Sequence, residues 1–356
     1  MKKCKTIGLV LASALLTTSA FSQITISGSN ETSYYFGGDT KQKLSTSGNP
    51  TSTTSGMGNE TTIRLSGTAK LPNGQNVTMY QVVDSDSTAA STGTLAERGF
   101  DIGIANGISF VYGYDRAFGS ELVRSITPLA TTRPTDTGAS NGAVADILDV
   151  TSNEHAVGFN ATDLVGKGST ISVAYNPNFS GDSLSSSDTI KQSTNNASGY
   201  GIGVRLTPVA GLTVAAGLTK IDHTASATSK DADSKVYGIA YAQAPFAIGI
   251  QRTDTDGLLA GGTTNDNDQT DLISATYAVT KEITLGYSYA EMERTRNAVK
   301  STVDGEVQTF SVAYNLGPVV LSYDHQKSEN APTSVTGDLV DGNDVTINKV
   351  KVRVAF

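Results

Sequence analysis

Short segments in which apolar and polar residues alternate recur along the chain after its first 22 residues. In nearly every segment the apolar or aromatic residues occupy every second position, which is typical of a β-strand with one apolar face. Sixteen such segments can be read: ITISGS, TTIRLSGTAK, VTMYQV, FDIGIA, ISFVYGY, HAVGFN, TISVAY, YGIGVRLT, LTVAAGLTK, VYGIAYA, FAIGIQR, DLISATYAV, ITLGYSY, QTFSVAYN, VVLSYDH and VTINKVKVRVAF. No segment after residue 22 is apolar enough for a membrane-spanning helix. The pattern therefore predicts an all-β chain.

The connections between these segments alternate between two lengths. Seven are short and rich in the residues of hairpin turns: 72–74, 106–107, 163–168, 208–211, 244–245, 281–282 and 317–318. Eight are long and polar: 37–58, 84–97, 115–154, 177–199, 222–234, 253–269, 291–306 and 325–344. Outer-membrane barrels place short turns in the periplasm and long loops outside the cell, whereas a soluble sandwich or propeller has no reason to sort its connections. We therefore predict a 16-stranded antiparallel transmembrane β-barrel.

The amino terminus has the three parts of a secretory signal peptide. Three lysines precede an apolar run over residues 7–16, and Ala20-Phe21-Ser22 supplies the small residues of a cleavage site. A run of about ten apolar residues is too short to span a bilayer. We expect residues 1–22 to be removed and residues 23–356 to form the barrel in the outer membrane.

Cleavage would change both the thiol content and the charge of the chain. It removes the only cysteine, Cys4, so the mature chain has no disulfide, thiolate metal site or cysteine nucleophile. It also removes three lysines, which leaves 23 basic against 34 acidic residues and a net charge of −11. A nucleic-acid partner is not expected, because phosphate binding calls for a basic surface.

One short motif resembles a catalytic one. Gly181-Asp182-Ser183-Leu184 matches the core of GDSL-type hydrolases, but it lies in a serine-rich predicted loop. The partner spacing also fails, because His325 follows Asp324 directly. A motif counts only in its structural context. We expect no enzymatic activity.

Candidate metal ligands are scattered rather than grouped. None of the three histidines, His155, His223 and His325, makes an HxH or HExxH arrangement. The acidic stretches 254–257 and 265–268 are similar to calcium loops but lack the spaced bidentate glutamate of an EF-hand. No cofactor or metal site is predicted, although weak divalent binding by an acidic outer loop stays open.

The last strand shows which face its charges occupy. Val350, Val352, Val354 and Phe356 fall on one side, and Lys349, Lys351 and Arg353 fall on the other. A lipid-facing base costs about 2–4 kcal/mol at the bilayer midplane, so the bases should face the lumen. The same alternation places Arg64 and Arg205 on the lumen side. These five bases are the predicted pore wall.

The whole predicted barrel resembles the Gram-negative general-diffusion porins. The likeness is carried by the signal peptide, the sixteen strands with eight long loops, the very long third loop and the terminal strand VKVRVAF. It implies a homotrimer surrounded by outer-membrane lipid, a lumen narrowed by the third loop, and recognition of Phe356 by the barrel-assembly machinery. The fifth strand departs from the family pattern, because Tyr112-Gly113 is followed by Tyr114-Asp115 and the nearest base is Arg116.

The third loop, about 115–154, is far longer than a hairpin needs, and such loops are usually functional or disordered. Residues 126–129, 143–145 and 147–148 are apolar pieces that could pack it against the inner wall. From 116 to 154 it holds five acidic and three basic residues, a net charge of −2. The predicted constriction residues are Glu121, Arg124, Arg133, Asp136, Asp146 and Asp149. The alternative is an extracellular loop that never enters the lumen.

A barrel of sixteen strands is wide enough to enclose water. We therefore predict a porin for the passive diffusion of small hydrophilic solutes and ions. The net charges of chain and loop favour cations, while the five wall bases oppose them locally within a screening length of roughly 8 Å. The expected outcome is a weak cation preference. Two alternatives stay open: a channel selective for anions or sugars, and a non-conducting exported β-rich binding protein or adhesin. The missing catalytic constellation counts against a barrel enzyme.

Overall fold

The computed structural model describes residues 23–36, 40–41, 55–86, 94–124, 126–129, 155–177, 197–223, 231–257, 266–296, 301–330 and 344–356. The predicted signal peptide, residues 1–22, lies outside this described part. The strands are β1 (Gln23–Phe36), β2 (Thr40–Lys41), β3 (Gly56–Lys70), β4 (Asn76–Asp86), β5 (Thr94–Ala105), β6 (Ile108–Tyr114), β7 (His155–Thr162), β8 (Thr170–Asn176), β9 (Ala197–Val209), β10 (Leu212–His223), β11 (Ala232–Gln243), β12 (Phe246–Asp256), β13 (Asp266–Ala278), β14 (Ile283–Arg296), β15 (Ser301–Asn315), β16 (Val319–Glu329) and β17 (Asp344–Ala355).

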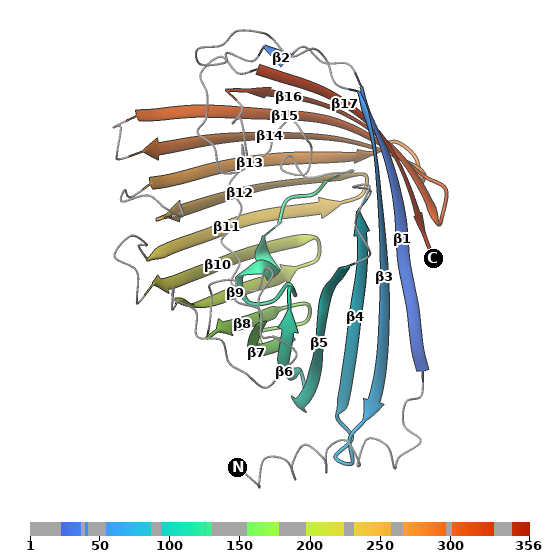
Figure 1. Cartoon of the computed structure of the whole chain (residues 1–356), viewed down its shortest axis with the longest axis vertical. Helices are drawn as coiled ribbons and strands as arrows, with labels where there is room; N and C mark the ends of the chain where they lie inside the picture. Colours follow the sequence, from blue (N-terminus) through green and yellow to red (C-terminus); the bar gives the residue numbers. More distant parts are fainter. Residues whose placement is uncertain are drawn as a thin grey trace.

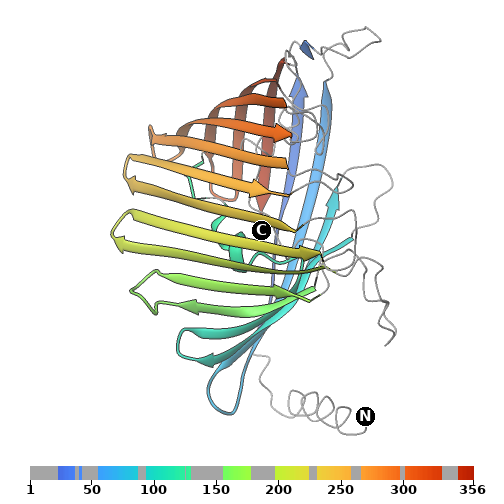
Figure 2. The same cartoon turned by 90° about the vertical axis from the view of Figure 1, so that its left-hand side faces the viewer.

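The strands close into one antiparallel barrel (Figures 1 and 2). From β3 to β17 each long strand pairs with the next one along the chain. β1 pairs with β3 on one side and with β17 on the other, in a register that sets Ser29 opposite Ala355. Apart from the two-residue β2, sixteen strands complete the ring. The prediction of a 16-stranded antiparallel barrel is confirmed.

The only described helix is the short 3₁₀ turn η1 (Gly119–Val123), which follows β6. No helix within the described ranges has the length and apolar character needed to cross a membrane.

Each of the sixteen alternating segments coincides with one of the long strands to within one residue at its end, but several strands run further than alternation indicated. β14 continues to Arg296 and β15 starts at Ser301, where the sequence predicted a long loop over 291–306. The physical reason lies in the outward side chains: Glu293 faces Asp304 across these strands. The hydrogen-bond ladder therefore continues after the apolar band has ended, and a pattern read from apolar residues cannot detect it.

The two faces of the sheet differ in chemistry. On the outer face, register aligns Val214, Ile239, Ile250 and Ile273 in one row across β10–β13. These aliphatic side chains are 38–52% exposed, whereas inward residues such as Thr253 are buried. An outward apolar band with polar residues facing inward is the pattern of a membrane-spanning barrel.

All seven predicted short turns join neighbouring strands, and glycine sets the geometry of several of them. Gly74 and Gly107 have φ angles of +82° and +75°, in the left-handed region that favours glycine. In the first turn the N–H of Leu71 donates to the carbonyl of Gln75 at 2.7 Å. Such tight turns leave the opposite end of the barrel to the long connections.

Candidate functional site

The first part of the third loop lies inside the barrel, against the inner wall. In Figures 1 and 2 the teal ribbon of η1 lies within the outline of the strands. Phe118, just before η1, is only 1% exposed. It belongs to an apolar cluster whose other members come from the inner faces of β6, β7, β8, β10 and β11: Val111, Ala156, Ala174, Ile221 and Ala232. The loop thus turns inward immediately after β6.

A second apolar cluster continues along the wall. Val123 and Ile126 of the loop are buried with Ala215 of β10 and Val236 of β11. Together the two clusters bury seven apolar side chains of the wall under the loop, and each buried CH₂ group contributes about 0.8 kcal/mol. Phe118, Val123 and Ile126 therefore hold this part of the loop to the wall by apolar contact.

Glycines on the wall make this close approach possible. A side chain at Gly203 would come within 2.3 Å of the carbonyl oxygen of Gly119, and one at Gly201 within 2.5 Å of the Ser120 hydroxyl. Contacts of 2.8–2.9 Å with loop side chains would arise at three further wall glycines: Gly158, Gly238 and Gly249. We call these five glycines the glycine track. Its members lie on β7, β9, β11 and β12, and their missing side chains form the seat of the loop.

Hydrogen bonds fix the loop on this seat. The N–H of Gly119 donates to Ser172 Oγ of β8 at 2.6 Å. Gln251 of β12 bridges the loop, because its Oε1 accepts from the N–H of Ile126 and its Nε2 donates to the carbonyl of Arg124, both at 3.0 Å. Two more bonds join Thr219 Oγ1 to Ser120 Oγ (2.5 Å) and Ser274 Oγ to the carbonyl of Pro128 (2.6 Å). Backbone polar groups that the loop buries are thus paired with wall side chains.

The root of the loop is tied by an ion pair. Arg116 donates to both carboxylate oxygens of Asp101 on β5, with Nη2 to Oδ2 at 2.8 Å. Burial opposes the charge on this guanidinium, but its hydrogen bonds to Asp101, together with the nearby Tyr80, outweigh burial and raise the pKa of Arg116 above its ordinary value. Arg116 and Arg64 of β3 each lie over the ring of Tyr80, at 4.7 and 4.5 Å from its centroid. The ring of Tyr80 thus makes cation–π contacts with two guanidinium groups.

The wall bases of β17 are gathered around one acid that sequence reasoning did not single out. Lys351 Nζ lies 3.1 Å and Arg353 Nε 3.2 Å from the carboxylate of Glu31 on β1. Lys349 is almost fully buried, and its Nζ lies 5.4 Å from the ring centroid of Tyr35. These residues meet because β1 pairs with β17 where the barrel closes. In that pairing Glu31 lies directly opposite Arg353.

The predicted site residues fall into three groups. Glu121 and Arg124 form an ion pair of 3.0 Å on the wall-bound part of the loop. Arg64 lies beside the root of the loop, and Lys349, Lys351 and Arg353 form the β17 group, while Arg205 lies partly buried on β9. The other four constriction residues lie outside the described ranges: Arg133, Asp136, Asp146 and Asp149.

Some contributors carried a signal in the sequence. Glu31 occupies the inward parity of the first strand, and glycine alternates with large residues through Gly199, Gly201 and Gly203. A charged residue or a glycine at inward positions could have marked both. Asp101 also occupies an inward position of its segment, but the sequence could not indicate its partner, because Arg116 comes from a loop.

Phe356, the predicted assembly signal, closes the barrel against β1. Its backbone N–H and C=O both bond with Gly28 at 3.0 Å. A side chain at Gly28 would come within 2.7 Å of the Phe356 ring.

In the described part of the chain no group of three histidine, cysteine or acidic residues gathers as a metal site. Ser183 of the hydrolase-like motif lies outside the described residues.

The chain was compared with known proteins. The sequence profile of the Gram-negative porins matches residues 8–331. Among solved structures, an anion-selective porin from Comamonas acidovorans is 15% identical, with 94% of this chain and 99% of that chain covered and a TM-score of 0.66. The trimer form of OmpT, an outer membrane protein of Vibrio cholerae, is 11% identical over 94% and 99% of the two chains, with a TM-score of 0.64. A porin variant of Rh. blastica is 15% identical over 94% and 100%, with a TM-score of 0.59.

No curated protein matches the chain significantly. At these identities the solved structures establish the fold alone. The family follows from the sequence profile, which spans most of the chain. The chain belongs to the Gram-negative porin family.

Proposed function

We propose that this porin forms a water-filled channel through the outer membrane for the passive diffusion of small hydrophilic solutes and ions. The observation that carries the proposal is the position of the described part of the third loop (116–124 and 126–129), which is seated on the glycine track of β7–β12. The wall of β17, β1, β3, β4 and β5 carries charged side chains instead. Solutes would pass between the loop and this charged wall. The chain would act without covalent chemistry or a cofactor.

We also propose that the channel prefers cations weakly. Bases that would attract anions are partly neutralised, since Glu31 pairs with Lys351 and Arg353, and Asp101 pairs with Arg116. The predicted mature charge of −11 attracts cations, and the paired bases oppose this attraction less than unpaired bases would. The second candidate is an anion-selective channel, favoured by the two guanidinium groups stacked on Tyr80.

Assembly as a homotrimer is part of the proposal. On the outer face of β1 and β3, Asn30 Nδ2 donates to Thr61 Oγ1 at 2.7 Å and Asn59 Nδ2 to Thr32 Oγ1 at 2.9 Å. Amide side chains facing hydrocarbon are costly, so this polar strip is better placed against another subunit than against lipid. Export by a cleaved signal peptide and recognition of Phe356 during assembly complete the proposal.

The test is electrical recording of the purified protein in a planar bilayer. We expect stepwise open channels and, in a tenfold gradient of potassium chloride, a reversal potential with the sign of a weak cation preference. A reversal potential of opposite sign would favour the anion-selective candidate. Absence of conductance from correctly folded protein would contradict a channel of either kind.

A further inference from the structure

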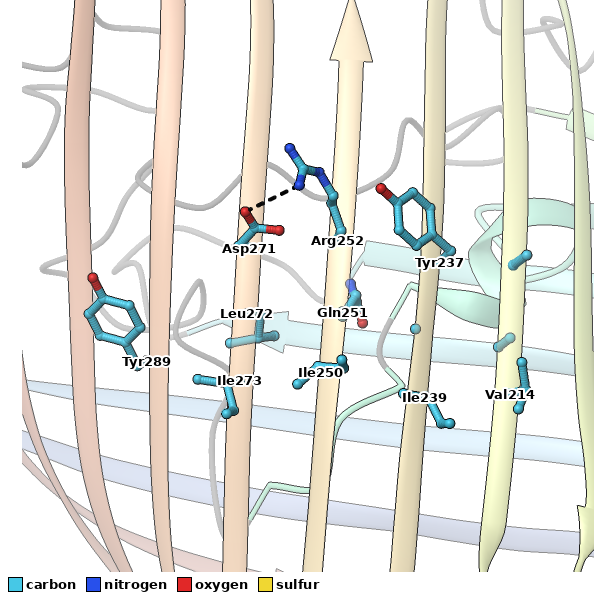
Figure 3. Close-up of a pocket in the computed structure, with 13 residues that line it drawn as sticks. Val214, Tyr237, Ile239, Ile250, Gln251, Arg252, Asp271, Leu272, Ile273 and Tyr289 are labelled. Atoms are coloured by element: carbon cyan, nitrogen blue, oxygen red, sulfur yellow. Dashed lines mark ion pairs between the residues drawn. The ribbon is translucent and has the colours of Figure 1, made fainter.

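The outer face of β10–β13 carries a shallow hollow of about 710 Å³. Its floor is the aliphatic row of Val214, Ile239, Ile250 and Ile273, which Figure 3 shows side by side on neighbouring strands. Ala216 lies opposite Tyr237 in the next row and leaves room at one end. The hollow faces away from the lumen, because its floor residues have the outward parity of their strands.

The rim of the hollow toward the long connections is polar. Tyr237, Arg252 and Asp271 occupy one cross-strand row directly beyond the aliphatic floor. Arg252 Nε lies 3.4 Å from Asp254 Oδ1, and its Nη1 lies 3.7 Å from Asp271 Oδ2 (Figure 3). Arg252 is thus flanked by two carboxylates at the point where the apolar band ends. Tyrosine at this level is typical of the interface between hydrocarbon and headgroups.

These ion pairs are loose. Charge-assisted N–H···O bonds of a guanidinium are usually about 2.7–2.9 Å long, and both distances at Arg252 are longer. The side chains of Arg252 and Asp271 are 36% and 50% exposed. The planar guanidinium fork is therefore only weakly engaged by these carboxylates, and its shape can bind a phosphate in two-pronged fashion.

We propose that this hollow binds one membrane lipid whose headgroup carries both a phosphate and an ammonium group. One hydrocarbon chain covers the aliphatic floor. Arg252 binds the phosphate, and the carboxylates of Asp254 and Asp271 bind the ammonium group. The charge pattern selects this headgroup, because a purely anionic headgroup would meet two carboxylates for each guanidinium.

The chain offers matched controls for this site. Lys327 on β16 also projects outward and pairs with Glu329 two residues further on, but it does not line the hollow. Lys327→Gln thus removes an equivalent outward charge elsewhere. Ala216→Phe fills the hollow without adding charge, and Ala161→Phe adds the same bulk to the outer face of β7, opposite Ile108.

Native mass spectrometry of the full chain in mild detergent tests the proposal, with phosphatidylethanolamine and phosphatidylglycerol of identical chains as probes. We expect the wild type to retain phosphatidylethanolamine about tenfold more strongly, the effect of one charge-assisted pair. The double variant Asp254→Asn/Asp271→Asn should remove this preference, whereas Arg252→Gln and Ala216→Phe should each lower the retention of both lipids. Lys327→Gln and Ala161→Phe should retain both lipids like the wild type, and all five variants should keep the wild-type conductance. Equal retention of the two lipids by the wild type would overturn the proposal, as would an unchanged preference in Asp254→Asn/Asp271→Asn. If that double variant fails to fold, unchanged retention in Ala216→Phe would overturn it.

Discussion

The inner wall of this porin has two parts that differ in chemistry. From β7 to β12 it is built mainly from glycine, alanine and small hydroxyl residues, and the described part of the third loop lies on it. Around β17, β1 and β3–β5 the wall carries Glu31, Arg64 and the bases of the last strand. Small residues occur where backbone must approach backbone, and charged residues occur where side chains can reach water. The same closed sheet thus serves as a seat on one side and as a charged surface on the other.

Breaking the seat should have the largest effect. Gly203→Val would place its side chain against the backbone of Gly119, where the free Cβ position is only 2.3 Å from the carbonyl oxygen. Overpacking of this kind costs about 1–3 kcal/mol, so we expect the loop to leave the wall and single-channel conductance to rise. Gly56→Val is the control, because nothing lies within 4 Å of that position. Equal conductance in both variants would show that the seat does not set the pore width.

Freeing the root of the loop should have the next largest effect. Asp101→Asn removes the carboxylate that pairs with Arg116, and hydrogen bonds to charged groups contribute about 1.5–3 kcal/mol. We expect a lower midpoint of urea unfolding and noisier open-channel current. Glu121→Gln breaks the neighbouring pair with Arg124 without touching the root and should disturb the current less. If Glu121→Gln disturbed the open-channel current more than Asp101→Asn, the anchor of the loop would be the Glu121–Arg124 pair.

Changing the charge of the wall should alter selectivity but not size. Glu31→Gln leaves Lys351 and Arg353 without their shared carboxylate, so the reversal potential should move toward anions at unchanged conductance. Lys351→Gln should move it toward cations. Glu329→Gln removes an acid from the outer face of β16 and should leave the reversal potential unchanged. If Glu31→Gln has no effect, the β17 group does not line the path of ions.

The acids predicted for the constriction should give the smallest shift. Replacing Asp136, Asp146 and Asp149 with asparagine changes the charge of residues 116–154 from −2 to +1. Because exposed charges are screened over roughly 8 Å, the reversal potential should move modestly toward anions. An unchanged reversal potential in intact channels would mean that these three residues lie away from the narrow point.

Local pattern was enough to predict the barrel, but not its internal contacts. Period-two alternation located every long strand, and the stripe ending at Phe356 placed the bases of β17 inward. The apolar piece 126–129 indicated a packing surface, yet its position beside Gln251 and Ser274 depends on strands more than 120 residues away. Likewise, Glu31 meets Lys351 only because the barrel closes. Contacts made by closure or by a loop have no periodic signature.

The central claim is that the third loop is a fixed part of the inner wall, and a disulfide tests it most directly. The hydroxyl oxygens of Ser120 in the loop and Thr219 on the wall lie 2.5 Å apart, so two thiols in their place would lie close to the S–S bond length of about 2.05 Å. The mature chain is expected to have no other thiol, because Cys4 belongs to the predicted signal peptide.

In the double variant Ser120→Cys/Thr219→Cys, single-channel conductance should be measured before and after reduction. We predict that the bridge forms spontaneously in the folded protein and that conductance is the same in both states, because the bond only joins groups already in contact. The pair Ser120→Cys/Gly56→Cys should not bridge. Two free thiols in the folded first variant, or a conductance that changes when its bridge is reduced, would contradict a third loop seated permanently on the wall.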